Sequence, residues 1–149
     1  MIDFSVLQRY SLFEGFGKEH IDKILPFLKQ EEFDAGADII IEGKQNDRLW
    51  LILEGRVAAV KNGIILMEIC EGSVFGEVEM LDADPAEATI KALATTKVLS
   101  LSIDALEKIQ KSELLIYSIL IKNLAKDLSR RLRRMDNLKT EQSHYMEWN

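Results

Sequence analysis

The stretch RVAAVKNGIILMEI, residues 56–69, holds two β-rich runs on either side of the dipeptide Asn62-Gly63. Asn and Gly both tolerate a positive φ, and the tight two-residue turn of a β-hairpin requires one at each position. The pattern predicts a hairpin with strands over residues 56–60 and 64–69. A mainly β fold is therefore the starting hypothesis for the chain.

The surrounding sequence extends the β pattern from Phe33 to Leu101. Further strands are expected at 49–53, 89–93 and 97–101, and the nearly continuous apolar run 49–53 predicts burial on both faces. Short runs separated by glycines at intervals of 4 to 12 residues are typical of a β-sandwich or barrel. The glycines are Gly36, Gly43, Gly55, Gly63, Gly72 and Gly76.

Helical patterns flank this β region. At the N-terminal side a short helix is expected over 19–28, although Pro26 interrupts its third turn. After the β region, Ser102 is a good N-cap for a helix over 104–111, and a longer helix is expected from Ser112 to about Lys139. We predict one domain over 1–149, with N-terminal helices in 1–30, a β-barrel over 33–101, C-terminal helices over 102–139 and a tail over 140–149.

The long C-terminal helix carries an apolar stripe with steps of three and four residues. A helix of this length exceeds what so small a domain can cover, so its far half is expected to pair with a second copy as a short coiled coil. The predicted homodimer stripe is Tyr117, Ile121, Leu124, Leu128, Leu132, Met135 and Leu138.

Composition excludes several classes of protein. The chain has 149 residues, no apolar run long enough to span a bilayer and no signal-peptide pattern at Met1.

Its single cysteine, Cys70, is expected to be a small buried residue at a strand end, and a reducing cytoplasm is the expected compartment. With His20 and His144 as its two histidines, the chain lacks the clustered metal ligands of a cupin enzyme, and it has no Walker loop.

The net charge of −6 is unevenly distributed. Residues 122–139 contain seven bases and two acids, a local charge of +5, which leaves −11 for the rest. The domain body is therefore unsuited to nucleic acid. The run Arg130-Arg131-Leu132-Arg133-Arg134 is expected to be the polar face of the dimer helix, with nucleic-acid contact as the alternative.

The loop from Phe75 to Thr89 has the layout of an anion site with the wrong charge for one. A glycine turn at Gly76 leads into a short acidic segment, and no Lys or Arg occurs from Phe75 to Ile90. A calcium site is one alternative, but the spacing matches no known calcium loop, and a solvated acidic turn is favoured. The acids are Glu77, Glu79, Asp82, Asp84 and Glu87.

In chain order these features resemble the cyclic-nucleotide-binding domain family of the catabolite activator and the kinase regulatory subunits. The similarity runs from about Leu12 to Met135 and rests on an ordered set of motifs. They are Leu12-Phe13-x-Gly15-Phe16, Phe33-x-x-Gly36, Ile41-x-Gly43, Asp47-x-Leu49-Trp50-Leu51-Ile52-Leu53-x-Gly55-Arg56-Val57, Gly72-x-x-Phe75-Gly76-Glu77 and Ala88-Thr89-Ile90-x-Ala92. The resemblance implies an eight-stranded jelly-roll β-barrel with flanking helices and a hinged C-terminal helix that forms the dimer interface.

The resemblance also implies that residues 75–89 are a phosphate-binding cassette. A short helix would begin near Gly76, and Glu77 would accept the ribose 2′-hydroxyl. The phosphate-pairing arginine of the family falls on Ala86, its small or hydroxyl neighbour falls on Glu87, and a usually small apolar position falls on Glu79. Lys91 is out of phase with the core-facing Ala88, Ile90 and Ala92 and so cannot replace the arginine. The ligand-binding positions of the cassette are Phe75, Gly76, Glu77, Val78, Ala86, Glu87 and Ala88.

We therefore expect a non-enzymatic sensory or regulatory module whose pocket is not a standard cAMP or cGMP site. It would respond to another small-molecule effector or serve as a scaffold for a partner protein, with no certain cofactor. Two alternatives stay open. The domain could bind cyclic nucleotide weakly through Glu77 and the loop amides, or it could be the sensor half of a helix-turn-helix regulator, for which residues 140–149 are too few to supply the DNA-binding domain.

Overall fold

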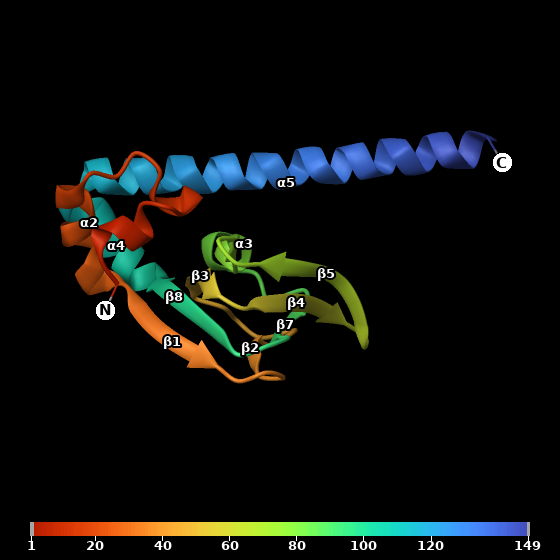
Figure 1. The fold of residues 1–149 in the computed structure, drawn as a ribbon, viewed down its shortest axis with the longest axis horizontal. Coiled ribbons are helices and arrows are strands. Elements are labelled where there is room, and N and C mark those ends of the chain that lie inside the picture. The colour runs from red at the N-terminus through yellow and green to blue at the C-terminus, as the bar shows by residue number, and fades with distance from the viewer. Residues whose placement is uncertain (1, 149) are drawn as a thin grey trace.

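The computed structural model describes residues 2–148, with side chains for residues 2–137. Within these residues eight strands form two four-stranded antiparallel sheets, in the orders β1-β8-β3-β6 and β2-β7-β4-β5. The sheets face each other as the jelly roll that the sequence predicts (Figure 1). The strands are β1 Lys29–Phe33, β2 Asp38–Ile40, β3 Arg48–Glu54, β4 Arg56–Lys61, β5 Ile64–Cys70, β6 Val74–Phe75, β7 Thr89–Ala92 and β8 Thr96–Ser102.

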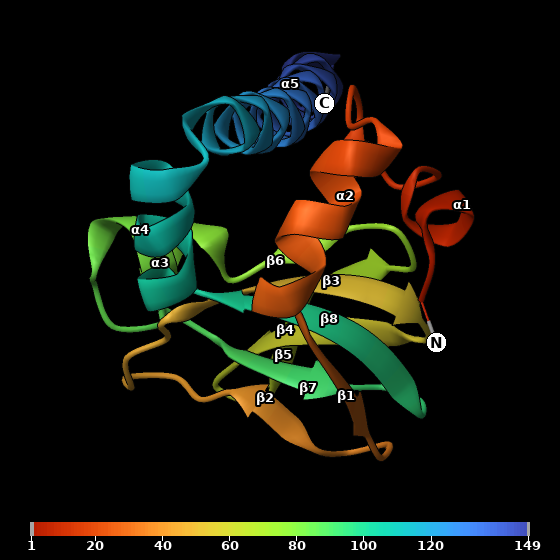
Figure 2. The same cartoon turned by 90° about the vertical axis from the view of Figure 1, so that its left-hand side faces the viewer.

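The helices gather on one side of this roll. Figure 2, a view nearly along α5, shows α2, α4 and α5 on the side of the first sheet, with the second sheet beneath it. The short helix α3 interrupts the strands between β6 and β7. The helical segments are α1 Phe4–Leu7, η1 Ser11–Phe13, α2 Lys18–Ile24, η2 Leu25–Phe27, α3 Glu77–Asp82, α4 Ile103–Ser112 and α5 Leu114–Trp148.

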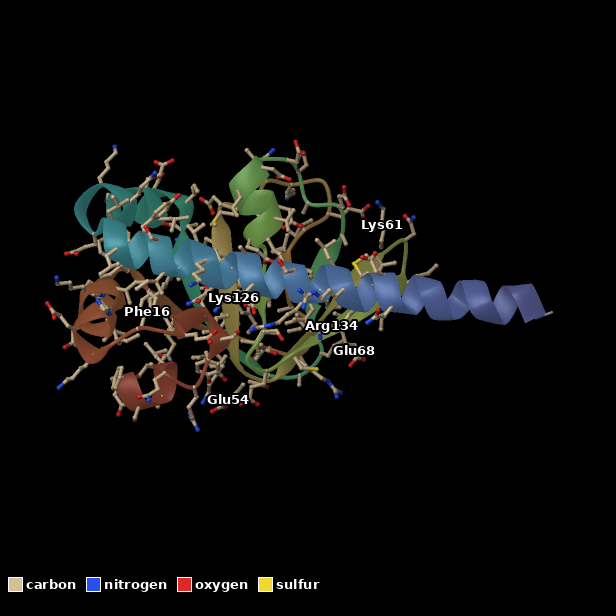
Figure 3. The ribbon with its side chains drawn as sticks, turned by 90° about the horizontal axis from the view of Figure 1, so that it is seen from above. Phe16, Glu54, Lys61, Glu68, Lys126 and Arg134 are labelled. Atoms are coloured by element: carbon tan, nitrogen blue, oxygen red, sulfur yellow. The ribbon has the colours of Figure 1, made fainter. Side chains whose placement is uncertain are left out.

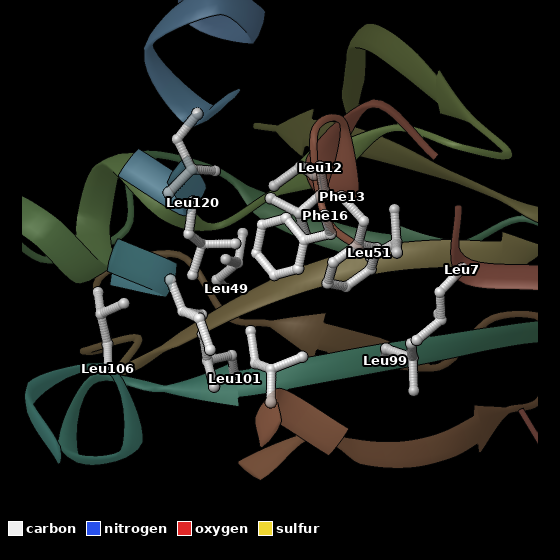
Figure 4. Close-up of a cluster of buried hydrophobic side chains, with 14 of the residues drawn as sticks. Leu7, Leu12, Phe13, Phe16, Leu49, Leu51, Leu99, Leu101, Leu106 and Leu120 are labelled. Atoms are coloured by element: carbon white, nitrogen blue, oxygen red, sulfur yellow. The ribbon is translucent and has the colours of Figure 1, made fainter. Parts of the chain in front are cut away.

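Strand β3 belongs to two hydrophobic clusters at once, because successive side chains of a strand point to opposite faces. Leu49, Leu51 and Leu53 pack under the helices, against residues such as Phe13 and Leu120 (Figure 4). Trp50 and Ile52 point into the space between the sheets, against residues that include Phe75 and Ala86. The prediction that residues 49–53 are buried on both faces is confirmed.

The predicted hairpin is present as β4 and β5, and both turn residues adopt a positive φ, 53° at Asn62 and 75° at Gly63. The cap of α4 also agrees with the sequence, since the Ser102 side chain accepts a hydrogen bond from the backbone N–H of Ala105. No helix in residues 2–148 combines the length and apolar character needed to cross a membrane.

Three expectations are corrected. The barrel begins at Lys29 instead of residue 33, because the polar strand β1, KQEEF, pairs with β8. The sequence of β1 has no alternation of apolar and polar residues from which the strand could be predicted. Cys70 is exposed, since β5 lies at the outer edge of its sheet. The last helix begins at Leu114 and continues to Trp148, through the residues expected to form a tail.

A substitution at Gly55 tests the turn between β3 and β4. Gly55 has φ +96°, and an added Cβ would lie 2.6 Å from the Thr95 carbonyl oxygen. We expect Gly55→Ala to lower the free energy of unfolding by about 3–5 kcal/mol, from positive-φ strain plus the clash. Urea denaturation measures the change.

Gly36 supplies the matched control, because its φ is +90° and an added Cβ meets nothing within 4 Å. Gly36→Ala should cost about 1–2 kcal/mol, the strain term alone. Equal losses for the two variants would contradict the steric argument at Gly55.

Candidate functional site

The predicted cassette begins at a turn that requires glycine. Gly76 precedes α3 with φ 82° and ψ −4°, a left-handed conformation. An added Cβ at Gly76 would lie 2.8–2.9 Å from the Asn46 side chain, the Arg48 carbonyl oxygen and the Trp50 ring. The backbone therefore passes against β3 with no room for a side chain. The short helix starts at Glu77, as the sequence analysis expects.

Asn46 holds this turn in place. Its side-chain amide donates to the carbonyl oxygens of Gly76 at 2.8 Å and Arg48 at 2.7 Å, and its Oδ1 accepts from the Trp50 indole at 3.3 Å. The Trp50 ring in turn stacks on Phe75, with an interplanar angle of 6°. One polar side chain thus joins the loop before β3 to the start of α3.

Glu77 is buried, with 1% of its surface exposed, which corrects the expectation of a solvated acidic turn at this residue. Its Oε1 lies 2.6 Å from the Arg131 Nη2 atom on α5. The same Arg131 nitrogen donates to the Val74 carbonyl oxygen at 2.7 Å. Although the ionic contact is close, neither carboxylate oxygen of Glu77 has a well-aligned hydrogen bond among the described residues.

Burial raises the pKa of the Glu77 carboxyl above its ordinary value, and the positive charge of Arg131 offsets part of that rise. The neighbouring Glu79 raises the pKa further by like-charge repulsion. The protonation state of Glu77 therefore depends on whether α5 keeps Arg131 in contact with it.

The other cassette positions fall into two groups. Phe75 and Ala86 lie in the cluster between the sheets, with Ala88 packed against that cluster, whereas Val78 and Glu87 are exposed. The Ala86 backbone is fastened to the turn after β2, because its N–H donates to Lys44 O at 2.9 Å and its carbonyl accepts from Gly43 N at 2.8 Å. The structure therefore brings Phe75 and Ala86 together and directs Glu77 to α5.

Lys91 does not serve the cassette. Its Nζ contacts Asp38 Oδ1 at 2.7 Å and donates to the Gly36 carbonyl oxygen at 3.2 Å. Ile90 and Ala92 are buried on the opposite side of β7. The alternation that the sequence predicts for this strand is confirmed.

Polar contacts fasten the first half of α5 to the N-terminal segment. The Asn123 amide, buried on this helix, donates to the carbonyl oxygens of Leu12 at 2.7 Å and Glu14 at 2.9 Å. One turn further, the Asp127 carboxylate accepts a hydrogen bond from the Ser11 hydroxyl at 3.3 Å. These contacts and the Arg131 pair lie along one side of the helix.

The face of α5 turned to the domain overlaps the predicted apolar stripe in its first half, where Tyr117, Ile121 and Leu124 pack in or against the cluster under the helices. The buried residues are Ile116, Leu120, Asn123 and Leu124, of which the stripe contains Leu124. Tyr117, Ile121 and Leu128 are half-buried, while Leu132 and Met135 are exposed. The Leu138 side chain lies outside the described residues.

Sequence reasoning missed Arg131 and Asn46. Continuing the buried face of α5 beyond Leu124 in steps of three and four leads to Asp127 and Arg131, so polar residues on an inward helix face were the available signal. Asn46 had no comparable signal, because its neighbourhood has the composition of an ordinary polar turn.

The acidic segment of the cassette is not arranged as a cation site. Asp82 Oδ1 accepts a hydrogen bond from the Asp84 backbone N–H at 3.0 Å, and Asp82, Asp84 and Glu87 are exposed. Among the described residues, no three His, Cys, Asp or Glu side chains are grouped closely enough to hold a metal ion.

Comparison with known proteins identifies the family. The profile of the cyclic nucleotide-binding domain matches residues 30–113, more than half of the chain. The chain belongs to the cyclic nucleotide-binding domain family. The match spans the jelly roll from β1 through α4 and includes the whole cassette, so the resemblance inferred from the ordered glycines is confirmed.

Individual relatives agree with this assignment. The chain is 28% identical to a cAMP-dependent protein kinase regulatory subunit of Yarrowia lipolytica over 68% of this chain and 30% of that protein. It is 29% identical to the cyclic AMP receptor protein of Thermus thermophilus over 84% of this chain and 58% of the relative. The chain therefore spans less than two thirds of either relative.

A solved structure agrees with the fold. A cyclic nucleotide-binding domain from Methylobacillus flagellatus superposes with a TM-score of 0.78 at 25% identity, covering 87% of this chain and 76% of that one.

Removing Arg131 tests the ion pair of this cyclic nucleotide-binding domain. Arg131→Met leaves the Glu77 carboxylate buried without a countercharge, so we expect the free energy of unfolding to fall by about 3 kcal/mol near neutral pH. Glu77→Gln in the same chain should recover most of the loss. Arg133→Met, at an exposed position of α5, is the matched control. Urea denaturation measures all four proteins.

The loss should depend on pH in a defined direction. Because the pKa of Glu77 is higher in the folded than in the unfolded chain, its contribution to stability is complete below the unfolded pKa and is lost as the pH rises through the folded pKa. Arg131→Met raises the folded pKa further, so its cost should be larger at about pH 8 than at about pH 5. A pH-independent cost would contradict the ionic origin of the effect.

Proposed function

We propose that this chain is a non-enzymatic regulatory module of the cyclic nucleotide-binding fold whose pocket is not a standard cAMP or cGMP site. The observation that carries the proposal is the residue pair at the ends of the cassette. Ala86, 3% exposed, packs in the cluster between the sheets where the family resemblance implies an arginine, and Glu77 is already in contact with Arg131.

The missing arginine matters because phosphate recognition depends on charge. A guanidinium makes charge-assisted, often bidentate hydrogen bonds to phosphate, and removing one partner of such a buried pair typically costs about 2–5 kcal/mol. The exposed Glu87 carboxylate beside Ala86 adds repulsion. A cyclic phosphate at this position would therefore bind weakly, which favours another small-molecule effector or a role as a scaffold for a partner protein.

The proposed output is the position of α5. Arg131 joins this helix to Glu77 of the cassette and to Val74 of β6, so a ligand or partner that displaces Arg131 removes one of the attachments of α5 to the barrel. Asn123, closer to the start of the helix, would keep that end attached through Leu12 and Glu14. Such an arrangement suits a helix with two positions, attached to the barrel or released from it, whose equilibrium depends on what binds at the cassette.

We also propose that two copies associate through the far half of α5. Leu132 and Met135 are 61% and 56% exposed, and α5 extends well beyond the barrel (Figure 1). Residues 64–67 of the edge strand β5 add four large apolar side chains that are 48–65% exposed. Large apolar surface of this kind is uncommon on monomers and favours an interface.

A second candidate function has one specific observation in its favour. The buried Glu77 carboxylate lacks a well-aligned hydrogen bond in the described residues, and a ribose hydroxyl would supply one. Because the Gly76 turn is also retained, weak binding of a cyclic nucleotide is the alternative to the proposed atypical pocket.

Calorimetry decides between these two functions. We expect the wild-type chain to bind cAMP and cGMP with dissociation constants weaker than about 10 μM, since a phosphate contact worth about 2–5 kcal/mol is absent. Ala86→Arg with Glu87→Ser should strengthen binding about 30-fold or more by the same estimate. Circular dichroism confirms that the variant is folded.

Tight binding by the wild-type chain would overturn the atypical-pocket proposal in favour of the second candidate. If the folded double variant gained no affinity, the loss of the arginine would not be the reason for weak binding. Ala86→Met with Glu87→Ser controls for the added bulk, because Met fills similar volume without a charge.

Light scattering after size-exclusion chromatography tests the dimer. We expect Leu132→Asp with Met135→Asp to weaken self-association about 100-fold or more, because each buried apolar side chain contributes roughly 1.5–3 kcal/mol. Leu114→Asp with Leu115→Asp is the matched control, since both leucines are similarly exposed but lie at the start of α5. A wild-type monomer at high micromolar concentration would refute the proposal.

A further inference from the structure

A small basic pocket lies beside the cassette, between α5, η1 and the turn before β6. Its volume is about 80 Å3, and Phe75, Gly76, Glu77 and Ala86 are not among its lining residues. The pocket is therefore separate from the interior of the barrel. Its charged and hydroxyl-bearing lining residues are Ser11, Ser73, Asp127, Arg130, Arg131 and Arg134.

Helix geometry explains why three arginines meet there. Positions 127, 130, 131 and 134 are separated by three or four residues, so their side chains emerge from one side of α5. Figure 3 shows Arg134 beyond Lys126 along this helix. Arg131 is the innermost of the three, with 28% of its side chain exposed, compared with 54% for Arg130.

The charges around the pocket do not balance. The lining contains three guanidinium groups and one carboxylate, and the Glu77 carboxylate outside the pocket pairs with Arg131, which leaves a net charge of +1. Asp127 contacts Arg130 at 3.3 Å and also accepts a hydrogen bond from Ser11, while Arg131 reaches out of the pocket to Glu77. The guanidinium groups around this small space repel one another, and an anion bound between them would attract each of them and offset that repulsion.

We propose that this arginine pocket binds a phosphate group, either free or as a monoester. Guanidinium groups match phosphate oxygens in bidentate geometry, and the Ser73 hydroxyl adds a neutral donor. One water molecule needs about 10–15 Å3 of such space, so the pocket of about 80 Å3 has room for a small tetrahedral anion.

A neighbouring pocket gives an attached organic group somewhere to lie. This second pocket has a volume of about 430 Å3 and shares Ser11 and Arg130 with the arginine pocket. Its wall includes Tyr10, Phe13 and Phe16. An aromatic phosphomonoester could thus place its phosphate among the arginines and its ring over the N-terminal segment.

Because Arg131 lines the pocket and also contacts Glu77, the two sites share one side chain. A phosphate group that recruits Arg131 weakens its contact with Glu77. Occupancy of the arginine pocket is therefore coupled to the cassette without entering it.

Calorimetry with inorganic phosphate and with phenyl phosphate, at constant ionic strength maintained with chloride, tests the proposal. We expect saturable binding at one site. Arg130→Met and Arg134→Met should each weaken it about 10-fold or more, since a charge-assisted hydrogen bond contributes about 1.5–3 kcal/mol. Both positions are exposed, so the variants should fold. Arg133→Met removes the same charge from a position that does not line the pocket. The affinity of this variant for either probe should stay within about 2-fold of the wild-type affinity.

Equal affinities for the two probes would mean that the phosphate alone is recognised, and tighter binding of phenyl phosphate would mean that the larger pocket also contributes. Absence of saturable binding to both probes would overturn the proposal. It would also be overturned if Arg133→Met weakened binding as much as Arg134→Met, which indicates general attraction to a basic helix. If Arg130→Met and Arg134→Met left the affinity unchanged but Ala86→Arg altered it, the phosphate would bind in the cassette and the proposal would be wrong.

Discussion

The burial of Glu77 is the constraint on which the arrangement of this domain depends. A carboxylate with 1% of its surface exposed requires a countercharge, and the cassette itself has no basic residue. The countercharge comes from Arg131 on α5, so an ion pair connects the cassette to the last helix. Any change that alters the charge of Glu77 or the position of Arg131 acts on both elements.

Close packing makes this connection mechanical as well as electrostatic. Strand β3 places Leu51 against the helices and Trp50 against Phe75 between the sheets, so both clusters share one strand. The Asn46 hydrogen bond and the turn at Gly76, which has no room for a side chain, fix the start of α3 relative to that strand. Packed interfaces switch between discrete arrangements. We therefore expect a change in the cassette to break or restore the Arg131 contact of α5, while the Asn123 contact with Leu12 is retained.

The cassette and the proposed phosphate site at the arginine pocket lie close together in this molecule. The cassette keeps the glycine turn of its family and has Ala86 where the resemblance implies an arginine. The side of α5 turned toward η1 and β6 has three arginines around a small pocket. Family membership therefore defines the fold and the regulatory class of the domain, while the ligand depends on individual side chains. Arg131 belongs to both sites and would make them interdependent.

The amino-acid sequence was enough to predict the β4–β5 hairpin and a β-sandwich or barrel, because Asn62-Gly63, the spaced glycines and the doubly apolar run 49–53 act through local backbone geometry and side-chain alternation. The more specific jelly roll was implied by the resemblance to the cyclic-nucleotide-binding domain family. The same resemblance implied that residues 75–89 are the cassette, with Ala86 at the position of the arginine. The folded structure was needed to show that Glu77 is buried, that β1 pairs with β8, and that Arg131 supplies the countercharge. These features join residues far apart in the chain, so their energies depend on burial and distance, which no local pattern encodes.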